Sequence, residues 1–318
     1  MNICILDGFT LNPGDLSWSK LEQVGEVDIY DRTPEELVLE RSVNAEIILT
    51  NKTRLSKETL ESLPNLKYIG VLATGFDVVD IQAAVELGIT VTNIPTYGTN
   101  SVAQMVFALV LEHCHHTQRH SEAVREGAWG RNPDWCFWNY PLIELADKTI
   151  GVVGFGRIGL QVTKIASAFG MRILAYDHNP RDIDLPGLQW AELSELMRKS
   201  DIVSLHCPLT SETEEMINSK KLSMMKDSAI LINTSRGKLV NNKDLADALN
   251  AGVIAGAGLD VLDVEPPLDT NPLLSAKNCI ITPHISWATK EARSRLLNMA
   301  VDNVTSFLVK NPQNVVRP

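Results

Sequence analysis

The stretch that most constrains the fold of this chain is residues 148–177, KTIGVVGFGRIGLQVTKIASAFGMRILAYD. Its apolar run at 150–153 predicts a strand that is buried on both faces of a parallel sheet. The glycines of GFGRIG, residues 154–159, follow at once. They stand where a chain must turn tightly, lie close to a pyrophosphate and pack a helix on the strand. A helix is then predicted up to Phe169, so the stretch is expected to form a βαβ unit whose helix N-terminus can bind a phosphate group.

A second predicted strand, residues 171–176, is followed by Asp177, which lies 18 residues after Gly159. A carboxylate at this distance is expected to bind the hydroxyl groups of a ribose. It favours NAD, because it would repel the 2′-phosphate of NADP, although Arg181 is close enough in sequence to keep some use of NADP open. Strand, glycines, helix, second strand and acid occur in this order, so we predict NAD binding. The competing interpretation is a glycine turn that binds no ligand.

The composition is that of an ordinary globular protein. Its 318 residues suggest two domains, and a hydrophobic share of 44% can supply each with a core. The net charge of −10 comes without a basic patch, which disfavours binding to a phosphate backbone. No apolar run approaches the roughly 20 residues of a membrane span, and residues 1–7 are typical of a strand and not of a signal peptide. We therefore expect a cytoplasmic protein that binds neither nucleic acid nor membrane.

The cysteines and histidines do not predict a metal site. The cysteines are widely separated, never occur as CxxC and are expected to be reduced thiols: Cys4, Cys114, Cys136, Cys207 and Cys279. His116 and His120 have the spacing of two ligands on one face of a helix. They lack nearby cysteine or carboxylate ligands in a fixed pattern, so a polar helix face is the simpler explanation. No metal is expected.

The first hundred residues alternate strand-like and helix-like runs, which predicts a separate α/β domain. Strands are predicted at 3–6, 27–30, 45–50, 68–72 and 90–93, and helices at 34–42, 56–62 and 80–87. The sequence Ala73-Thr74-Gly75-Phe76 follows the fourth strand, where a turn can present backbone N–H groups to a substrate carboxylate. The competing interpretation is a plain turn between a strand and a helix.

Two features mark the path of the chain between the domains. Residues 101–104, SVAQ, predict a capping box ahead of a long helix, and we place the domain crossing there. Between 127 and 141 the chain becomes rich in aromatic residues: Trp129, Trp135, Phe137, Trp138 and Tyr140. So many aromatic side chains require burial, either as an arm over a neighbouring subunit or against their own domain. The sequence supports both interpretations equally.

The alternation of strands and helices continues after Asp177. Strands are predicted at 202–206, 229–233, 254–259 and 279–282, which with the two earlier strands gives six in a doubly wound parallel sheet. A last helix, predicted over 290–309, is expected to return to the first domain. The predicted fold class is α/β with two Rossmann-like lobes. These are a smaller, discontinuous, flavodoxin-like substrate domain (1–98 and 288–318) and an NAD-binding domain (99–287).

Three residues that follow successive strands of this sheet suit the reduction of a carbonyl group. Ligands of an open α/β sheet bind at the carboxyl ends of its strands, where Arg236, Glu265 and His284 are predicted to converge. A planar guanidinium can bind the carboxylate and the ketone oxygen of a 2-oxo acid together, which suits Arg236. A histidine can protonate the ketone oxygen after hydride transfer, which suits His284. A carboxylate on the other ring nitrogen would orient the ring and favour its protonated form, which suits Glu265.

Each of these residues also has a purely structural interpretation. Arg236 could bind pyrophosphate, Glu265 could be a loop acid before two prolines, and His284 could be a core histidine with satisfied hydrogen bonds. Their joint occurrence after three successive strands of a dinucleotide-binding sheet favours a catalytic set.

Nearly the whole chain resembles the D-isomer-specific 2-hydroxyacid dehydrogenase family. The resemblance rests on VGFGRIG (153–159), HCPLTSET (206–213), INTSRG (232–237), GLDVLDVEPP (258–267) and TPHISW (282–287). It implies Arg236, Glu265 and His284 as the catalytic set. It implies that the substrate is bound by Ala73, Thr74, Gly75, Arg236 and His284. It implies that NAD is bound by Gly154, Gly156, Arg157, Ile158, Gly159, Asp177, Cys207, Pro208, Thr213, Thr234 and Asp260.

Within the family, three stretches resemble glycerate dehydrogenases, also called hydroxypyruvate reductases: LATGFDVVD (72–80), YGTNSVAQMVFAL (97–109) and NPDWCFW (132–138). The expected activity is reduction of hydroxypyruvate to D-glycerate with NADH, with the proton from His284. One alternative is a dehydrogenase for glyoxylate, pyruvate or a bulkier keto acid. Another is an NAD-sensing module that binds partner proteins, as C-terminal-binding co-repressors do. The family resemblance also implies a homodimer formed through the NAD-binding domain.

Overall fold

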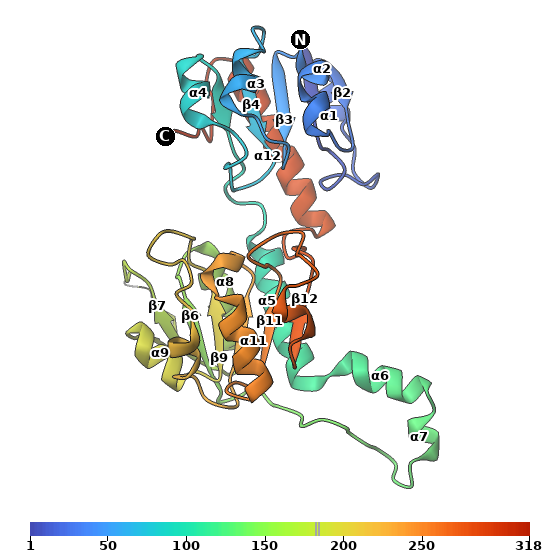
Figure 1. The fold of residues 1–318 in the computed structure, drawn as a ribbon, viewed down its shortest axis with the longest axis vertical. Helices are drawn as coiled ribbons and strands as arrows, with labels where there is room; N and C mark the ends of the chain where they lie inside the picture. The colour runs from blue at the N-terminus through green and yellow to red at the C-terminus, as the bar shows by residue number, and fades with distance from the viewer. Residues whose placement is uncertain (182, 184) are drawn as a thin grey trace. The chain divides into compact units, whose positions relative to one another are not determined.

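Figure 1 shows the fold in a computed structural model, which describes residues 1–181, 183 and 185–318. The chain divides into two units. The first comprises Met1–Gly98 and Trp287–Pro318, and the second comprises Thr99–Ser286. The predicted domain boundary after residue 287 differs from this division by one residue. Both units are of the α/β class, as the sequence predicts.

The first unit contains a sheet of five parallel strands in the order β2-β1-β3-β4-β5. The strands are β1 (Asn2–Ile5), β2 (Glu26–Ile29), β3 (Ile47–Thr50), β4 (Tyr68–Val71) and β5 (Thr90–Thr92). Strands β1, β3 and β4 are buried along nearly their whole length, as the central strands of a sheet covered on both faces must be. The strand order is that of flavodoxin-like folds, so the predicted class of this unit is confirmed.

The helices that cover this sheet come from both ends of the sequence. They are α1 (Ser19–Glu22), α2 (Val38–Ser42), α3 (Lys57–Glu61), α4 (Ile81–Glu86) and α12 (Lys290–Leu308), with a 3-10 turn η1 (Glu35–Leu37) before α2. The predicted helix over 34–42 is thus two shorter elements, because the Leu37 N–H bonds to the Pro34 carbonyl three residues back. Helix α12 packs its buried residues Leu296, Ala300 and Val304 into the core of this unit. The C-terminal helix therefore completes the N-terminal unit, as predicted.

The second unit contains a sheet of seven parallel strands in the order β12-β11-β10-β9-β6-β7-β8. The strands are β6 (Thr149–Val153), β7 (Arg172–Tyr176), β8 (Leu188–Trp190), β9 (Ile202–Leu205), β10 (Ile230–Asn233), β11 (Gly256–Leu259) and β12 (Cys279–Ile281). The order is doubly wound, as predicted, with its switch point between β6 and β9. The predicted number of six strands is wrong, because β8 adds an edge strand. None of its three residues is buried, so β8 lacks the apolar run that marks a central strand.

The helices of the second unit flank this sheet. They are α5 (Thr99–His115), α8 (Arg157–Ala168), α9 (Leu193–Lys199), α10 (Ser219–Leu222) and α11 (Asn242–Ala251), with 3-10 turns η2 (Gly237–Leu239) and η3 (Pro272–Ser275). The long helix α5 begins before the predicted capping box, which is therefore wrong. Ser101 lies inside the helix, is buried, and donates through Oγ to the Ser286 carbonyl at 2.5 Å. The Ser101 hydroxyl, which the sequence predicts to cap a helix, thus forms a tertiary hydrogen bond instead.

The segment rich in aromatic residues belongs to an arm, residues 117–144, that projects from the rest of the second unit (Figure 1). It consists of α6 (Thr117–Arg125), α7 (Ala128–Arg131) and the extended chain that follows. Trp129, Trp135 and Trp138 are 53%, 86% and 64% exposed. Tyr140 instead packs at the base of the arm, with its ring centroid 4.8 Å from that of His116. Packing against the same domain therefore does not account for the three tryptophans.

Candidate active site

The glycine loop joins β6 to α8 and has little room for side chains at two of its positions. A Cβ atom on Gly154, whose φ is +92°, would lie 2.5 Å from the Cys207 nitrogen. One on Gly159 would lie 2.2 Å from the Gly154 carbonyl oxygen, whereas one on Gly156 would meet no atom within 4 Å. The loop is therefore packed tightly against α8 and the end of β9 but leaves open space at Gly156, beside the N-terminus of α8. This geometry fits a pyrophosphate group.

Asp177 stands directly after β7, where the sequence predicts a carboxylate that binds ribose. Its Oδ2 accepts the Phe155 N–H at 2.7 Å, and its Oδ1 accepts the Asn179 N–H at 2.9 Å. Burial acts to raise the pKa of Asp177, but these hydrogen bonds and the charge of Arg181 together hold it below its ordinary value. Arg181 donates to the Phe155 carbonyl at 2.5 Å, so a guanidinium lies on the same loop.

The loop after β9 carries Cys207, Pro208 and Thr213. Burial raises the pKa of the Cys207 thiol to about 11, so this side chain is neutral at physiological pH. Thr213 is buried, and its Oγ1 donates to the Pro208 carbonyl at 2.7 Å while accepting the Thr210 N–H at 2.8 Å. Thr213 therefore holds this loop in shape, in addition to the cofactor contact that the family resemblance implies.

The loop after β10 contains a polar atom that lacks a partner. The Oγ1 of Thr234 is buried and makes no hydrogen bond within the described ranges. A buried hydroxyl is costly unless a ligand or water bonds to it, so Thr234 fits a contact with a polar group of the cofactor. The loop itself is fixed, because Ser235 Oγ donates to the Cys207 carbonyl at 2.9 Å and Asn233 Nδ2 donates to the Arg236 carbonyl at 2.9 Å. The Arg236 side chain is exposed, and its Nη1 donates to the Ser235 carbonyl at 2.8 Å.

His284 and Glu265 contact each other directly. His284 Nδ1 lies 2.5 Å from Glu265 Oε2, and Glu265 Oε1 accepts the Leu262 N–H at 3.1 Å. The two residues lie in the loops after β12 and β11, which are neighbours in the sheet. His284 has a φ of +54°, and its N–H donates to the Asp260 carbonyl at 2.9 Å. The structure thus brings two of the three predicted catalytic residues together, and Arg236 follows the next strand, β10.

Asp260 is fully buried beneath the loop that carries His284. Its Oδ1 accepts the Ile285 N–H at 2.9 Å and the Thr282 hydroxyl at 2.5 Å, and its Oδ2 accepts the Ser286 N–H at 2.8 Å. The family resemblance implies a cofactor contact for this residue. The structure adds a second role, because Asp260 fixes the backbone on both sides of His284. The sequence does not reveal this role, because the bonded groups lie more than twenty residues further along the chain.

Gly237, which follows Arg236, is a second site residue whose role the sequence does not reveal. A Cβ atom on Gly237 would lie 1.9 Å from the carbonyl carbon and oxygen of Leu262. The loops after β10 and β11 therefore approach so closely that only glycine fits between them. Gly237 is the last residue of the INTSRG motif, but the sequence of the motif does not show which loop this glycine contacts.

The predicted substrate turn, residues 73–75, lies after β4 in the first unit. Thr74 Oγ1 donates to the Ile94 carbonyl at 2.8 Å, and the Ile94 N–H donates to the Ala73 carbonyl at 2.9 Å. Asn93 Nδ2 donates to the Thr74 carbonyl at 2.8 Å. The turn is thus tied to the loop after β5 through its carbonyls and its hydroxyl. Its role in binding a substrate carboxylate stays a prediction.

The histidines near the base of the arm are not arranged as a helical ligand pair. His116 has a φ of +47° and separates α5 from α6, so it does not share a helix with His120, contrary to the spacing argument. His120 Nδ1 lies 3.0 Å from the His116 carbonyl oxygen. Across the described residues no group of three histidine, cysteine, aspartate or glutamate side chains could hold a metal ion. In the same ranges, no helix has the length and apolarity to cross a membrane.

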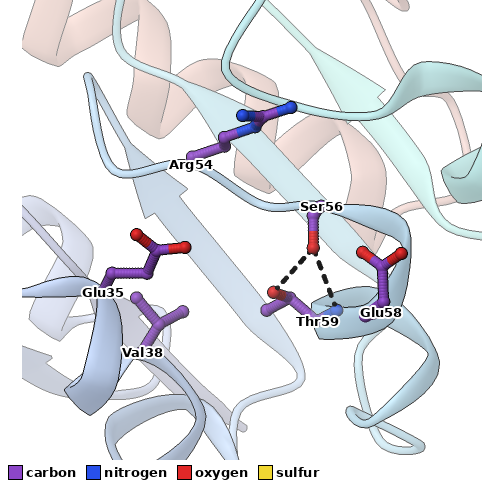
Figure 2. Close-up of a pocket in the computed structure, with 6 residues that line it drawn as sticks. All are labelled: Glu35, Val38, Arg54, Ser56, Glu58 and Thr59. Atoms are coloured by element: carbon purple, nitrogen blue, oxygen red, sulfur yellow. Dashed lines mark hydrogen bonds between the residues drawn. The ribbon is translucent and has the colours of Figure 1, made fainter.

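An open surface cavity of about 250 Å³ lies on the first unit (Figure 2). It is lined by Glu35, Val38, Arg54, Ser56, Glu58 and Thr59. Ser56 is engaged as the N-cap of α3, where its Oγ accepts the Thr59 N–H at 3.4 Å. The lining mixes two carboxylates with one guanidinium and includes none of the predicted site residues. It therefore indicates no particular class of ligand.

Comparisons with known proteins agree with this geometry. Residues 107–286 match the family model described as D-isomer specific 2-hydroxyacid dehydrogenase, NAD binding domain. A hydroxypyruvate reductase from Blautia hydrogenotrophica is 53% identical over 99% of both chains, and a glycerate dehydrogenase from Methylorubrum extorquens is 45% identical over 89% of both. A D-lactate dehydrogenase from Aquifex aeolicus, solved with NAD and lactic acid, has a TM-score of 0.80 and 32% identity, covering 98% of this chain and 96% of that one. The chain therefore belongs to the D-isomer-specific 2-hydroxyacid dehydrogenase family, and its second unit is the NAD-binding domain.

Proposed function

We propose that this protein reduces hydroxypyruvate to D-glycerate with NADH. The observation that carries the proposal is the 2.5 Å contact between His284 and Glu265 at the carboxyl ends of the strands of the NAD-binding sheet. Similarity to the hydroxypyruvate reductase of B. hydrogenotrophica, which spans nearly the whole of both chains, supports the choice of substrate. When bound, NADH supplies the hydride that reduces the ketone carbon.

The proposed catalytic side chains have different tasks. Arg236 binds the carboxylate and the ketone oxygen of the substrate through its planar set of donors. Glu265 orients the His284 ring through Nδ1 and stabilises its positive charge, so Nε2 gives the proton to the oxygen that becomes the hydroxyl group. The backbone N–H groups of residues 73–75 bind the substrate carboxylate.

The cofactor contacts in this proposal lie along the carboxyl ends of β6, β7, β9, β10 and β11. The open space at Gly156 and the buried, unpartnered hydroxyl of Thr234 support them. The full set comprises Gly154, Gly156, Arg157, Ile158, Gly159, Asp177, Cys207, Pro208, Thr213, Thr234 and Asp260. The ionised carboxylate of Asp177 favours NADH over NADPH, while Arg181 beside it permits some use of NADPH.

The experiment that tests this function measures loss of NADH absorbance with hydroxypyruvate, glyoxylate, pyruvate, phenylpyruvate and 3-phosphohydroxypyruvate. Hydroxypyruvate should give the highest kcat/KM. His284→Ala should lower kcat by about 10³-fold and Glu265→Gln by about 10²-fold, with little change in the Kd of NADH. His115→Ala is the matched control, because His115 is an exposed histidine of the same unit.

Three outcomes would contradict the proposal in different ways. A higher kcat/KM for another substrate of the panel would assign the protein to that 2-oxo acid. Absence of turnover on all five, with NADH still bound, would favour an NAD-sensing module that binds a partner protein. Substantial activity in His284→Ala would show that another group supplies the proton.

We infer that the arm contacts a second copy of the chain, so that the protein is a homodimer. Three exposed tryptophans on one projecting segment are typical of the core of an interface. Sedimentation velocity should show a dimer, and Trp135→Ala combined with Trp138→Ala should shift it toward monomer. Leu39→Ala, at an exposed apolar residue outside the arm, should not. A wild-type monomer at micromolar concentration would contradict the inference.

We also infer that the protein acts in the cytoplasm on small 2-oxo or 2-hydroxy acids. The five cysteines are free thiols, and such thiols persist in a reducing compartment.

A further inference from the structure

We propose that Asp7 is a positioning residue for the substrate turn, residues 73–75 of the first unit. The proposal rests on the function proposed above, because it concerns the turn to which we assign the substrate carboxylate. Asp7 comes two residues after β1, at the edge of the first sheet where the carboxyl ends of its parallel strands lie.

The Asp7 carboxylate binds three consecutive backbone N–H groups. Its Oδ1 accepts the Asn51 N–H at 2.7 Å, and its Oδ2 accepts those of Lys52 at 2.5 Å and Thr53 at 2.8 Å. Converging N–H groups of this kind form a nest that binds anions, and here the anion is a side chain of the same protein. Hydrogen bonds to an ionised acceptor are roughly twice as strong as neutral ones, so Asp7 holds residues 51–53, the nest turn, firmly.

The nest turn lies at the topological switch point of the first sheet. In the order β2-β1-β3-β4-β5 the direction of winding reverses between β1 and β3. Ligands of such sheets bind at the carboxyl ends of the strands at that point. Asp7 follows β1 and the nest turn follows β3, so the Asp7 carboxylate occupies the anion site at the switch point. This arrangement leaves the next loop, the substrate turn after β4, to receive the carboxylate of a substrate.

Hydrogen bonds connect the nest turn to the segment that contains the substrate turn. The Thr50 carbonyl accepts the Leu72 N–H at 2.7 Å, just before both turns. The Leu55 N–H donates to the Val78 carbonyl at 2.8 Å, just after both turns. The two turns therefore lie between the same two points of attachment. Because Asp7 fixes the nest turn, loss of Asp7 should also loosen the substrate turn.

The opposite flank of the substrate turn does not depend on Asp7. It is held by the bonds of Thr74 and Ala73 to Ile94 and of Asn93 to Thr74. Removal of Asp7 should therefore displace the substrate turn without unfolding it. A displaced turn binds the substrate carboxylate less well both before and during the reaction, so the expected change is in KM and not in kcat.

The test compares Asp7→Ala with Asp31→Asn. Asp31 is the matched control, because it is exposed and comes two residues after β2, as Asp7 does after β1. In Asp7→Ala the KM for hydroxypyruvate should rise about tenfold, with kcat within about threefold of wild type and the Kd of NADH unchanged. Millimolar formate, a carboxylate small enough for the emptied nest, should lower the KM of Asp7→Ala but not that of wild type. An unchanged KM in folded Asp7→Ala, or a raised KM that formate does not lower, would overturn the proposal.

Hydrogen exchange supplies a second readout that needs no turnover. The N–H groups of residues 51–53 and 72–76 should exchange at least about tenfold faster in Asp7→Ala than in wild type, and at wild-type rates in Asp31→Asn. Equal rates in both regions would overturn the proposal. Should wild type fail to reduce hydroxypyruvate, the proposed function is wrong, while the exchange rates still decide the role of Asp7. Asp7→Asn keeps one acceptor oxygen and should change exchange in the same direction, so it replaces Asp7→Ala if that variant does not fold.

Discussion

Among the carboxylates in the described ranges that accept hydrogen bonds from backbone N–H groups in loops after parallel strands, four bear on the proposed sites: Asp7, Asp177, Asp260 and Glu265. Each such hydrogen bond restrains both partners, because it fixes the acid and also the loop that supplies the N–H group. At the scale of single residues, the predicted chemistry therefore depends on acids that are held in place before any ligand binds.

Asp177→Ala should weaken the preference for NADH over NADPH. The carboxylate would repel a 2′-phosphate, and the Arg181 guanidinium stands on the same loop, bonded to the Phe155 carbonyl at 2.5 Å. We expect the ratio of kcat/KM for NADH to that for NADPH to fall at least about tenfold, which corresponds to about 1.4 kcal/mol. Asp227→Ala, at an exposed acid of the same unit, should leave the ratio unchanged. An unchanged ratio in Asp177→Ala would mean that this residue does not contact the ribose.

His113 should make the protein less stable as the pH falls. Burial lowers the pKa of its imidazole, although a hydrogen bond to the Ala257 backbone opposes this effect. The unfolded chain takes up a proton near about pH 6.5, whereas the folded chain takes it up only at lower pH. The free energy of unfolding, measured with urea, should therefore fall below about pH 6.5 by up to about 1.4 kcal/mol per pH unit. His113→Asn should reduce this slope, and the same change at exposed His115 should not.

At the scale of elements, the site depends on how closely neighbouring loops approach. Adjacent parallel strands end at one edge, so the loops after β10, β11 and β12 are neighbours. The loops after β10 and β11 are in close backbone contact, because a Cβ atom on Gly237 would lie 2.5 Å from the backbone nitrogen of Asp263. The position of Arg236 relative to the Glu265 loop therefore follows from the absence of a side chain at residue 237.

Gly237→Ala should damage both stability and activity. The added methyl group would overlap the Leu262 backbone and push the two loops apart. We expect a loss of about 1–3 kcal/mol in the free energy of unfolding and a fall in kcat/KM of about tenfold or more. Gly130→Ala is the control, because a Cβ there would meet no atom within 4 Å. Wild-type kcat/KM in a folded Gly237→Ala variant would show that the close approach is not required.

At the scale of the whole molecule, the first unit is built from both ends of the chain. Arg293 of α12 is buried and donates to both carboxylate oxygens of Asp15, at 2.7 Å each. It also donates to the Leu11 carbonyl at 3.0 Å, so one side chain ties the C-terminal helix to the N-terminal loop. The hydrogen bonds to Asp15 act to raise the pKa of Arg293, so the charge of the guanidinium is maintained.

Arg293→Met should lower the Tm of the first unit. The change keeps much of the apolar length of the side chain but leaves the Leu11 carbonyl and Asp15 without their donor. We expect a fall of about 3–6 °C by differential scanning calorimetry. Arg295→Met, at an exposed arginine of the same helix, should change the Tm much less. Equal effects of the two substitutions would show that the link between the chain ends adds no special stability.

Most elements could be predicted because burial on both faces of a parallel sheet demands apolar runs. Strand β6 at Thr149–Val153 and strand β9 at Ile202–Leu205 differ by about one residue from the predicted 150–153 and 202–206. The wrong predictions concern elements that are not strands buried on both faces of a sheet. Strand β8 lies at an edge with no buried residue, and Ser101 has the sequence context of a cap but is buried against Ser286.

The sequence by itself determined the two α/β units, the glycine loop and the residue types that follow each strand. It could do so because these depend on local periodicity and on the alignment of parallel strands. Only the tertiary structure decided which groups the acids bind. Asp7 reaches residues 51–53, Glu265 reaches His284, and Asp260 holds the backbone around His284. These contacts join loops that are distant in sequence, and such loops meet only after the sheets have formed.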